Sequence, residues 1–199
     1  MADEQYIREG AWLLVTASSA GAADSLRVAI WRKLRSLGAL YLHQSVCVLP
    51  ARPEVQREIR RLVDRVRANG GTARVLRIAF DDINEEAQII AELQAARDDE
   101  YGEVLERVPA FLDEITSERD RDRATYEEVE ESEADLERFH AWLAKITARD
   151  YFAAPAGPTA HAAVQDAAAD LAAFEQAALA TEAPEPGVNL ANPVERRRT

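Results

Sequence analysis

Arginine side chains are the groups in this sequence whose type and spacing best fit a chemical role. They recur at helical spacing within 22–37 and 53–69, away from the apolar positions, and one tryptophan lies among them. A guanidinium group donates paired hydrogen bonds that match phosphate oxygens, and an aromatic ring beside it can stack on a base or pack on a partner. The sequence therefore predicts a basic, nucleic-acid-binding surface. The candidate residues are Arg27, Trp31, Arg32, Arg35, Arg57, Arg60, Arg61, Arg67 and Arg77.

Both features of this surface have ordinary alternatives. Arginine-rich helix faces are about as often simply solvated, without any bound anion. The ring of Trp31 can instead pack against the helical part of the chain that follows. The sequence alone leaves both alternatives open.

Residues suited to catalysis or metal binding are not clustered in the sequence. The three histidines, His43, His140 and His161, are scattered, and the single cysteine, Cys47, sits in an alternating apolar segment where a small hydrophobic residue fits. Glycine-rich phosphate loops are absent, and the many carboxylates of 81–150 are expected on solvated helix faces. The sequence therefore predicts no enzyme activity, no metal site and no cofactor.

The composition also indicates a cellular compartment. A single cysteine rules out an internal disulfide and favours a reducing environment. The first four residues lack the basic-then-apolar order of a secretory signal, and no run of about 18 apolar residues could span a membrane. We therefore expect a cytoplasmic protein without a membrane partner.

Charge divides the chain into two unlike parts. Residues 1–80 hold 13 Lys and Arg against 7 Asp and Glu, whereas 81–199 hold 11 against 29. The two parts therefore carry net charges of +6 and −18, which make up the −12 of the whole chain. This asymmetry indicates a basic unit that meets an anion and an acidic unit with a different task.

The apolar pattern of the first 80 residues predicts a strand, a helix, a long bent strand, a second helix and a last strand. The helices are expected over about 22–37 and 53–69, and glycines stop both. The apolar stretch between them is too long for one flat strand, and dividing it at a bend gives the βαββαβ order of a ferredoxin-like fold. Both helices would then cover one face of an antiparallel sheet. In the last strand, Leu76 and Ile78 share one side and Arg77 points to the other.

The remaining sequence predicts helices without strands. Apolar residues recur every three or four positions over 85–116 and again over 129–146, which favours an antiparallel helical hairpin. An alanine-rich helix follows a Pro/Gly/Ala linker, and Pro, Gly and Asn near the end indicate disorder. The predicted fold class is α+β. The predicted units are a ferredoxin-like domain at 11–82, a helical hairpin at 83–152, a C-terminal helix at 159–180 and a disordered tail at 181–199.

Several strings of residues carry a resemblance to a known family. The most specific are Ser25-Leu26-Arg27 with Trp31-Arg32, and Gln44-Ser45-Val46 with Leu49-Pro50. In this order they resemble the N-terminal part of the ChrB family, the regulators of chromate resistance, and the likeness covers about 12–180. The resemblance implies a transcription regulator with a ferredoxin-like N-terminal domain. That domain is similar in outline to the phenylacetate-repressor C-terminal domain and to CRISPR spacer-acquisition endonucleases.

Two departures from these relatives shape the functional prediction. ChrB regulators usually continue into a separate C-terminal domain, which is not part of this sequence. The endonucleases carry an Asp at the end of their first strand to hold a metal, whereas Val15-Thr16-Ala17-Ser18 offers no carboxylate there. A metal-dependent nuclease is therefore the least favoured hypothesis.

Two hypotheses remain ahead of the nuclease. The first is a ChrB-like, DNA-binding or DNA-associated regulator linked to chromate resistance, which forms a homodimer and meets phosphate through its arginines. The second is an accessory protein that binds a protein partner through its acidic helices and never touches DNA. Binding of DNA that weakens steeply with salt would separate the two.

Overall fold

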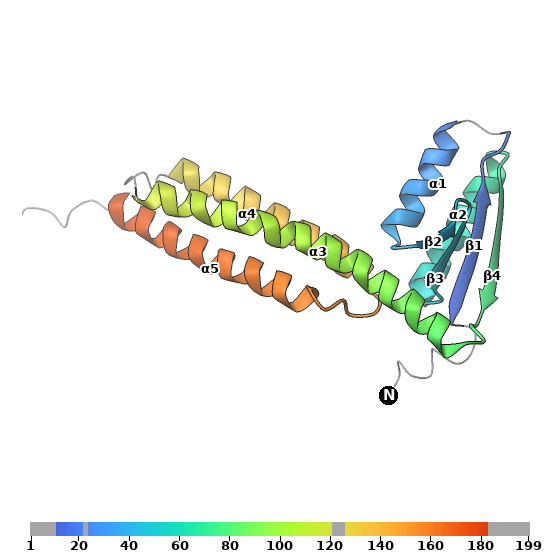
Figure 1. The fold of residues 1–199 in the computed structure, drawn as a ribbon. Helices are drawn as coiled ribbons and strands as arrows, with labels where there is room; N and C mark the ends of the chain where they lie inside the picture. Colours follow the sequence, from blue (N-terminus) through green and yellow to red (C-terminus); the bar gives the residue numbers. More distant parts are fainter. Residues whose placement is uncertain (1–10, 22–23, 121–125, 183–199) are drawn as a thin grey trace, which may run out of the picture.

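The computed structural model describes residues 11–21, 24–120 and 126–182, and it shows a small sheet domain joined to a long rod of helices (Figure 1). None of the helices in these ranges is long and apolar enough to cross a membrane. The elements in chain order are β1 (Trp12–Ser18), α1 (Asp24–Ser36), β2 (Leu40–His43), β3 (Val46–Pro50), α2 (Pro53–Ala68), β4 (Thr72–Ile78), α3 (Ile83–Asp120), α4 (Tyr126–Thr147) and α5 (Gly157–Glu182).

The four strands form one antiparallel sheet in the order β2-β3-β1-β4. The central strand β1 pairs with β3, where Leu14 stands opposite Val48, and with β4, where it stands opposite Leu76. The predicted bent strand is two strands, β2 and β3, joined by a turn at Gln44 and Ser45. With α1 after β1 and α2 after β3, the chain follows the βαββαβ order, and the predicted α+β fold is confirmed.

The helices α1 and α2 cover the same face of the sheet, as the sequence predicts. Three residues of α1 and five of α2 are buried in one cluster with the strand residues of that face. Both helices end at glycines, Gly38 and Gly70, whose φ angles are +68° and +79°. Glycine adopts this left-handed conformation without a steric penalty, so both helices stop where the sequence places their ends. The strand residues in the cluster are Leu13, Val15, Cys47, Leu49 and Ala73.

The opposite face of the sheet carries the first turns of α3. Ile89 and Leu93 of this helix pack in one cluster with Trp12 of β1. The ring of Trp12 is 2% exposed, it stacks on Phe152 with the ring centres 5.5 Å apart, and its Nε1 donates a 2.7 Å hydrogen bond to Glu86 Oε1. A buried indole with a satisfied N–H combines large apolar contact with a directed bond, so Trp12 anchors α3 on the sheet.

Strand β4 differs from expectation in the side that it buries. The alternation of Leu76 and Ile78 against Arg77 is confirmed by the pairing with β1, but Leu76 is 50% exposed, whereas Ala73 is buried beneath the helices. Arg77 stands opposite Leu13 and therefore lies on the side that the helices cover. Both sides of β4 carry apolar residues, so its sequence does not reveal which side meets α1 and α2.

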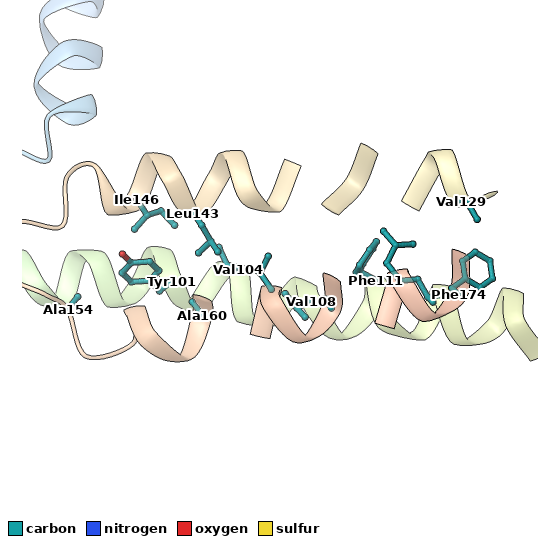
Figure 2. Close-up of a cluster of buried hydrophobic side chains, with 14 residues drawn as sticks. Tyr101, Val104, Val108, Phe111, Val129, Leu143, Ile146, Ala154, Ala160 and Phe174 are labelled. Atoms are coloured by element: carbon teal, nitrogen blue, oxygen red, sulfur yellow. The ribbon is translucent and has the colours of Figure 1, made fainter. Parts of the chain in front are cut away.

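The helices α3, α4 and α5 form a bundle with a core of its own. Figure 2 shows the side chains between them, including Tyr101 and Phe174, which are 1% and 0% exposed. The sequence predicts a hairpin followed by a separate helix, whereas α5 contributes to the same core as α3 and α4. The helix α5 includes 181–182, and the rest of the predicted tail, 183–199, lies outside the described residues.

The loop between α4 and α5 ties the rod to the sheet domain. Tyr151 donates from its hydroxyl to the carbonyl of Leu37 over 2.9 Å, and Arg52 donates to the carbonyl of Tyr151. Gln94 of α3 donates to the carbonyl of Phe152 over 2.9 Å. Backbone carbonyls that accept such bonds hold the loop in one position. The two parts are therefore joined by directed contacts as well as by the continuous helix α3.

A buried charge cluster lies at the same junction. Arg97 is 8% exposed and donates to Glu100 over 2.9 Å, and Arg149 donates to the second oxygen of Glu100 over 2.9 and 3.1 Å. Burial lowers the pKa of Arg97, and the charge of Glu100 opposes that change. Gly38 faces the cluster, because a Cβ atom there would lie 2.8 Å from Arg97 Nη1 and 3.0 Å from Arg149 Cβ. The end of α1 is therefore packed directly against the rod.

Candidate nucleic-acid interface

The predicted arginines lie on the surface of the sheet domain. Four of the nine candidates project from α1, four from α2 and one from β4, and all nine are exposed. Residues 11–80 hold 12 Lys and Arg against 4 Asp and Glu, which gives a net charge of +8. A compact domain with this charge attracts anions over a range of several ångströms.

Glu58 lies between the two helices and neutralises part of this charge. Lys33 of α1 and Arg61 of α2 donate to its two oxygens over 2.5 and 2.6 Å. The hydrogen bond and the charge of Lys33, with smaller contributions from Arg61, hold the pKa of the Glu58 carboxyl below its ordinary value. The pair with Lys33 links α1 to α2, and Arg61 is a candidate whose guanidinium already has a carboxylate partner.

Three of the candidates converge where α2 lies beside the edge strand β4. Arg60, Arg67 and Arg77 line a groove of about 440 Å³ with an apolar floor. One carboxylate, Asp64, shares the groove. Arg67 is held in place, because it donates to the carbonyl of Ala73 over 3.1 Å. The groove thus presents three guanidinium groups against one carboxylate, which suits an anionic ligand.

Two other candidates line a groove at the β2 edge of the sheet. Arg27 and Trp31 of α1 face a groove of about 620 Å³ that also includes residues of the β2–β3 turn. The ring of Trp31 is 48% exposed, and Cζ of Arg35 lies 5.2 Å from its centre, which is a cation–π contact. The groove is built from sheet-domain residues. Among the described residues, Trp31 belongs to no apolar cluster of the rod, so its packing against the helical rod is not confirmed.

The nine candidates thus form two grooves and a connecting surface instead of a single patch. Arg60, Arg67 and Arg77 belong to one groove, and Arg27 and Trp31 belong to the other. The remaining candidates, which line neither groove, are Arg32, Arg35, Arg57 and Arg61. The sequence shows that all of these residues face solvent, but the division depends on which strands each helix covers.

Tyr41 is not among the predicted candidates, yet it lines the same groove as Trp31. Tyr41 lies on the edge strand β2 and stands opposite Cys47, so its ring points to the side of the sheet that α1 covers. Burial, with a smaller contribution from Cys47, raises the pKa of Tyr41, and the phenol stays neutral at pH 7. The sequence signal for Tyr41 was its place between Leu40 and Leu42 in a short strand, where its side chain points to the opposite side from theirs.

The groups that are reactive in other proteins stay apart in this structure. Cys47 is 1% exposed, and burial raises the pKa of its thiol to about 12, so the thiolate does not form at neutral pH. His161 lies on the rod, 3.0 Å from Thr147 Oγ1, whereas His43 ends the strand β2. Within 11–21, 24–120 and 126–182, no group of three or more His, Cys, Asp or Glu residues could hold a metal ion.

Fold and surface together define an α+β protein whose ferredoxin-like sheet domain exposes arginines and whose helical rod has its own core. A comparison with protein families places it further: the family described as "Protein ChrB, N-terminal" matches residues 27–184. The chain therefore belongs to the ChrB N-terminal family, and the resemblance seen in the sequence is confirmed. A search of curated proteins and a search of solved structures found no match.

Proposed function

We propose that this protein is a regulator linked to chromate resistance that contacts DNA through the arginines of α1, α2 and β4. Membership of the ChrB N-terminal family supports the regulatory role. The observation that carries the DNA contact is the exposure of all nine candidate residues on a domain of net charge +8, within a chain of net charge −12. Phosphate groups are the dominant partners of such surfaces, because each contact releases condensed counterions.

In this proposal the two parts of the molecule have opposite effects on DNA. The arginines at both edges of the α1–α2 layer bind phosphates and fix the orientation of the protein, while the acidic rod repels the duplex. Repulsion by the rod restricts the contact to the sheet domain. A homodimer, which the sequence also predicts, would place two such surfaces on one DNA molecule.

The accessory-protein hypothesis is the second candidate. It is favoured by a groove of about 410 Å³ between α3 and α4, which is lined by several carboxylates, among them Glu114, Glu131 and Asp135. A basic protein partner would fit this groove by charge. This hypothesis takes first place if the chain does not bind DNA.

We also propose that the protein does not cleave nucleic acids. The end of β1, Ala17-Ser18, provides hydroxyl and methyl groups where a nuclease of related fold holds its metal with a carboxylate. The purified protein is incubated with single-stranded and double-stranded DNA or RNA and Mg²⁺ or Mn²⁺. Cleavage that survives repurification and disappears on substitution of one specific carboxylate would contradict this proposal.

The direct test of DNA contact is a footprint of arginine reactivity on the full chain. Phenylglyoxal modifies exposed guanidinium groups, and mass spectrometry measures the modification of each arginine with and without DNA at low ionic strength. We expect DNA to protect Arg57 and Arg60 of α2 and to leave Arg138 unprotected, because Arg138 is exposed on the acidic rod. Equal protection of the three arginines, or failure of the chain to bind DNA, would contradict the proposal and favour the accessory-protein hypothesis.

A further inference from the structure

The groove at the β2 edge contains two aromatic rings, which a site that binds only phosphate does not need. Trp31 is 48% exposed and Tyr41 38% exposed, and both rings line it together with the half-exposed Val28. Exposure of an aromatic ring to water is unfavourable, because burial of its apolar surface would stabilise the protein. Two such rings in one groove indicate a planar or apolar ligand.

The same groove carries positive charge and lies on the basic sheet domain. Among the described residues that line it, Arg27 is the one with a charge, and the others are apolar or carry hydroxyl and amide groups, such as Ser18 and Gln44. Arg35 adds a second guanidinium, held on the ring of Trp31. Among the residues that the structure describes, no carboxylate lines this groove, although the whole chain contains 36 Asp and Glu. The ligand that suits it is therefore planar and anionic.

We propose that this groove binds an unpaired base of DNA, which stacks on Trp31 and Tyr41 while Arg27 and Arg35 bind the flanking phosphates. The inference rests on the proposed DNA contact and adds a preference for single-stranded or locally unpaired DNA. Bases in a duplex are stacked on one another, so an aromatic platform is used only by a base that has left the stack. The groove volume of about 620 Å³ lies within the usual range for ligand pockets, about 300–1,000 Å³.

The groove between α2 and β4 differs in composition, because it has the arginines of a phosphate site without rings for stacking. It gathers three arginines and Asp64 over aliphatic side chains, and none of the described residues that line it is aromatic. The two grooves therefore have different roles. The groove between α2 and β4 binds the backbone of any DNA, and the groove at the β2 edge selects DNA with an unpaired base.

The experiment compares three DNA molecules of one sequence with the full chain: a single strand, a perfect duplex and a duplex with one bulged base. Anisotropy of labelled DNA measures affinity, and tryptophan fluorescence reports stacking. We expect the single strand and the bulged duplex to bind about ten-fold more tightly than the perfect duplex and to quench the fluorescence. Trp31→Phe, which keeps an aromatic face, should keep the affinity within about three-fold and lose most of the quenching.

Trp31→Ala should lower the affinity for the single strand about ten-fold without changing the salt dependence, because stacking releases no counterions. Leu76→Ala is the matched control, since Leu76 is equally exposed but lies on the other face of the sheet. The affinity of the Leu76→Ala variant for the single strand should equal that of the unmodified chain. Circular dichroism of each variant checks the fold, and Trp31→Phe keeps the test valid if Trp31→Ala unfolds.

Two results would overturn the inference while leaving the proposed function in place. One is equal affinity of the duplex and the single strand with no effect of Trp31→Ala. The other is binding of adenosine monophosphate as tight as that of the single strand, which would make a free nucleotide the ligand. If the chain binds none of the three DNA molecules at low ionic strength, the proposed function fails as well.

Discussion

The sheet domain and the helical rod differ in the burial of their aromatic residues and in the sign of their net charge. The rod buries its aromatic residues Tyr101 and Phe174 in its own core, and residues 81–199, to which it belongs, have a net charge of −18. The sheet domain has a well-packed core too, yet it leaves Trp31 and Tyr41 partly in solvent and carries a net charge of +8 over 11–80. Burial of Tyr101 and Phe174 is accounted for by packing, whereas the exposed rings and arginines of the sheet domain are not.

The sheet domain and the rod are joined by several directed contacts. The two parts meet through Trp12, the α4–α5 loop and the charge cluster around Glu100, so the rod is fixed relative to the basic surface. A rod held in this way presents its acidic side chains at one constant place beside the proposed DNA site.

The largest effect is expected from Trp12→Ala, which breaks the connection. Trp12 is almost fully buried and contacts Phe80, Phe152 and Glu86 from both parts. Its removal leaves a cavity and an unpaired carboxylate, so we expect the free energy of unfolding to fall by about 3–5 kcal/mol. Urea denaturation measures the change. Trp31→Ala is the matched control and should cost about 0.5 kcal/mol; similar losses for both variants would contradict this account.

A smaller effect is expected from Gly38→Ala at the end of α1. The left-handed backbone disfavours alanine, and the new methyl group would meet Arg97 and Arg149. We expect a loss of about 2–3 kcal/mol, again measured by urea denaturation. Gly70→Ala is the control, because Gly70 has the same backbone conformation with no atom of the described residues within 4 Å of its added Cβ, and about 1–2 kcal/mol is expected. Equal losses would show that α1 is not packed tightly on the rod.

The smallest effect concerns Glu58 and pH. Its pKa in the folded protein lies below the ordinary value of 4.5 because of Lys33, so its contribution to stability is present above pH 4.5 and is lost as the pH falls through the folded pKa. Thermal unfolding from about pH 6 to about pH 3 should therefore show a difference between wild type and Glu58→Gln that shrinks as the pH falls. Lys33→Met should produce the same pattern. A difference that stays constant over this range would contradict the assignment.

Much of the fold of the sheet domain could be predicted because each element carries its own signal. Helical spacing of Leu26, Ile30 and Leu34 and the stop at Gly38 define α1 from local sequence alone. The buried side of β4 could not be predicted in this way. It depends on which strand residues α2 packs over, since Ala73 of β4 lies in one buried cluster with Val63 and Val66 of α2. Local periodicity contains no information about such a contact.

The candidate site shows the same division between local and distant causes. The exposure of the arginines follows from helical periodicity, whereas the two grooves arise only when each helix packs over its own strands. Tyr41 reaches the groove of Trp31 because its strand is at the edge of the sheet, and the order of strands is a property of the whole domain. The sequence could therefore identify the residue types but not their grouping.

DNA is proposed to meet the sheet domain and not the rod, and the salt dependence of binding tests this localisation. The full chain is compared with Arg57→Gln/Arg60→Gln and with Arg138→Gln/Lys145→Gln, which change the net charge equally but lie on α2 and α4. In a plot of log affinity against log salt concentration, we expect the α2 pair to reduce the slope by about two units and the α4 pair to leave it unchanged. Equal reductions, or no salt-sensitive binding by the unmodified chain at low ionic strength, would contradict the account.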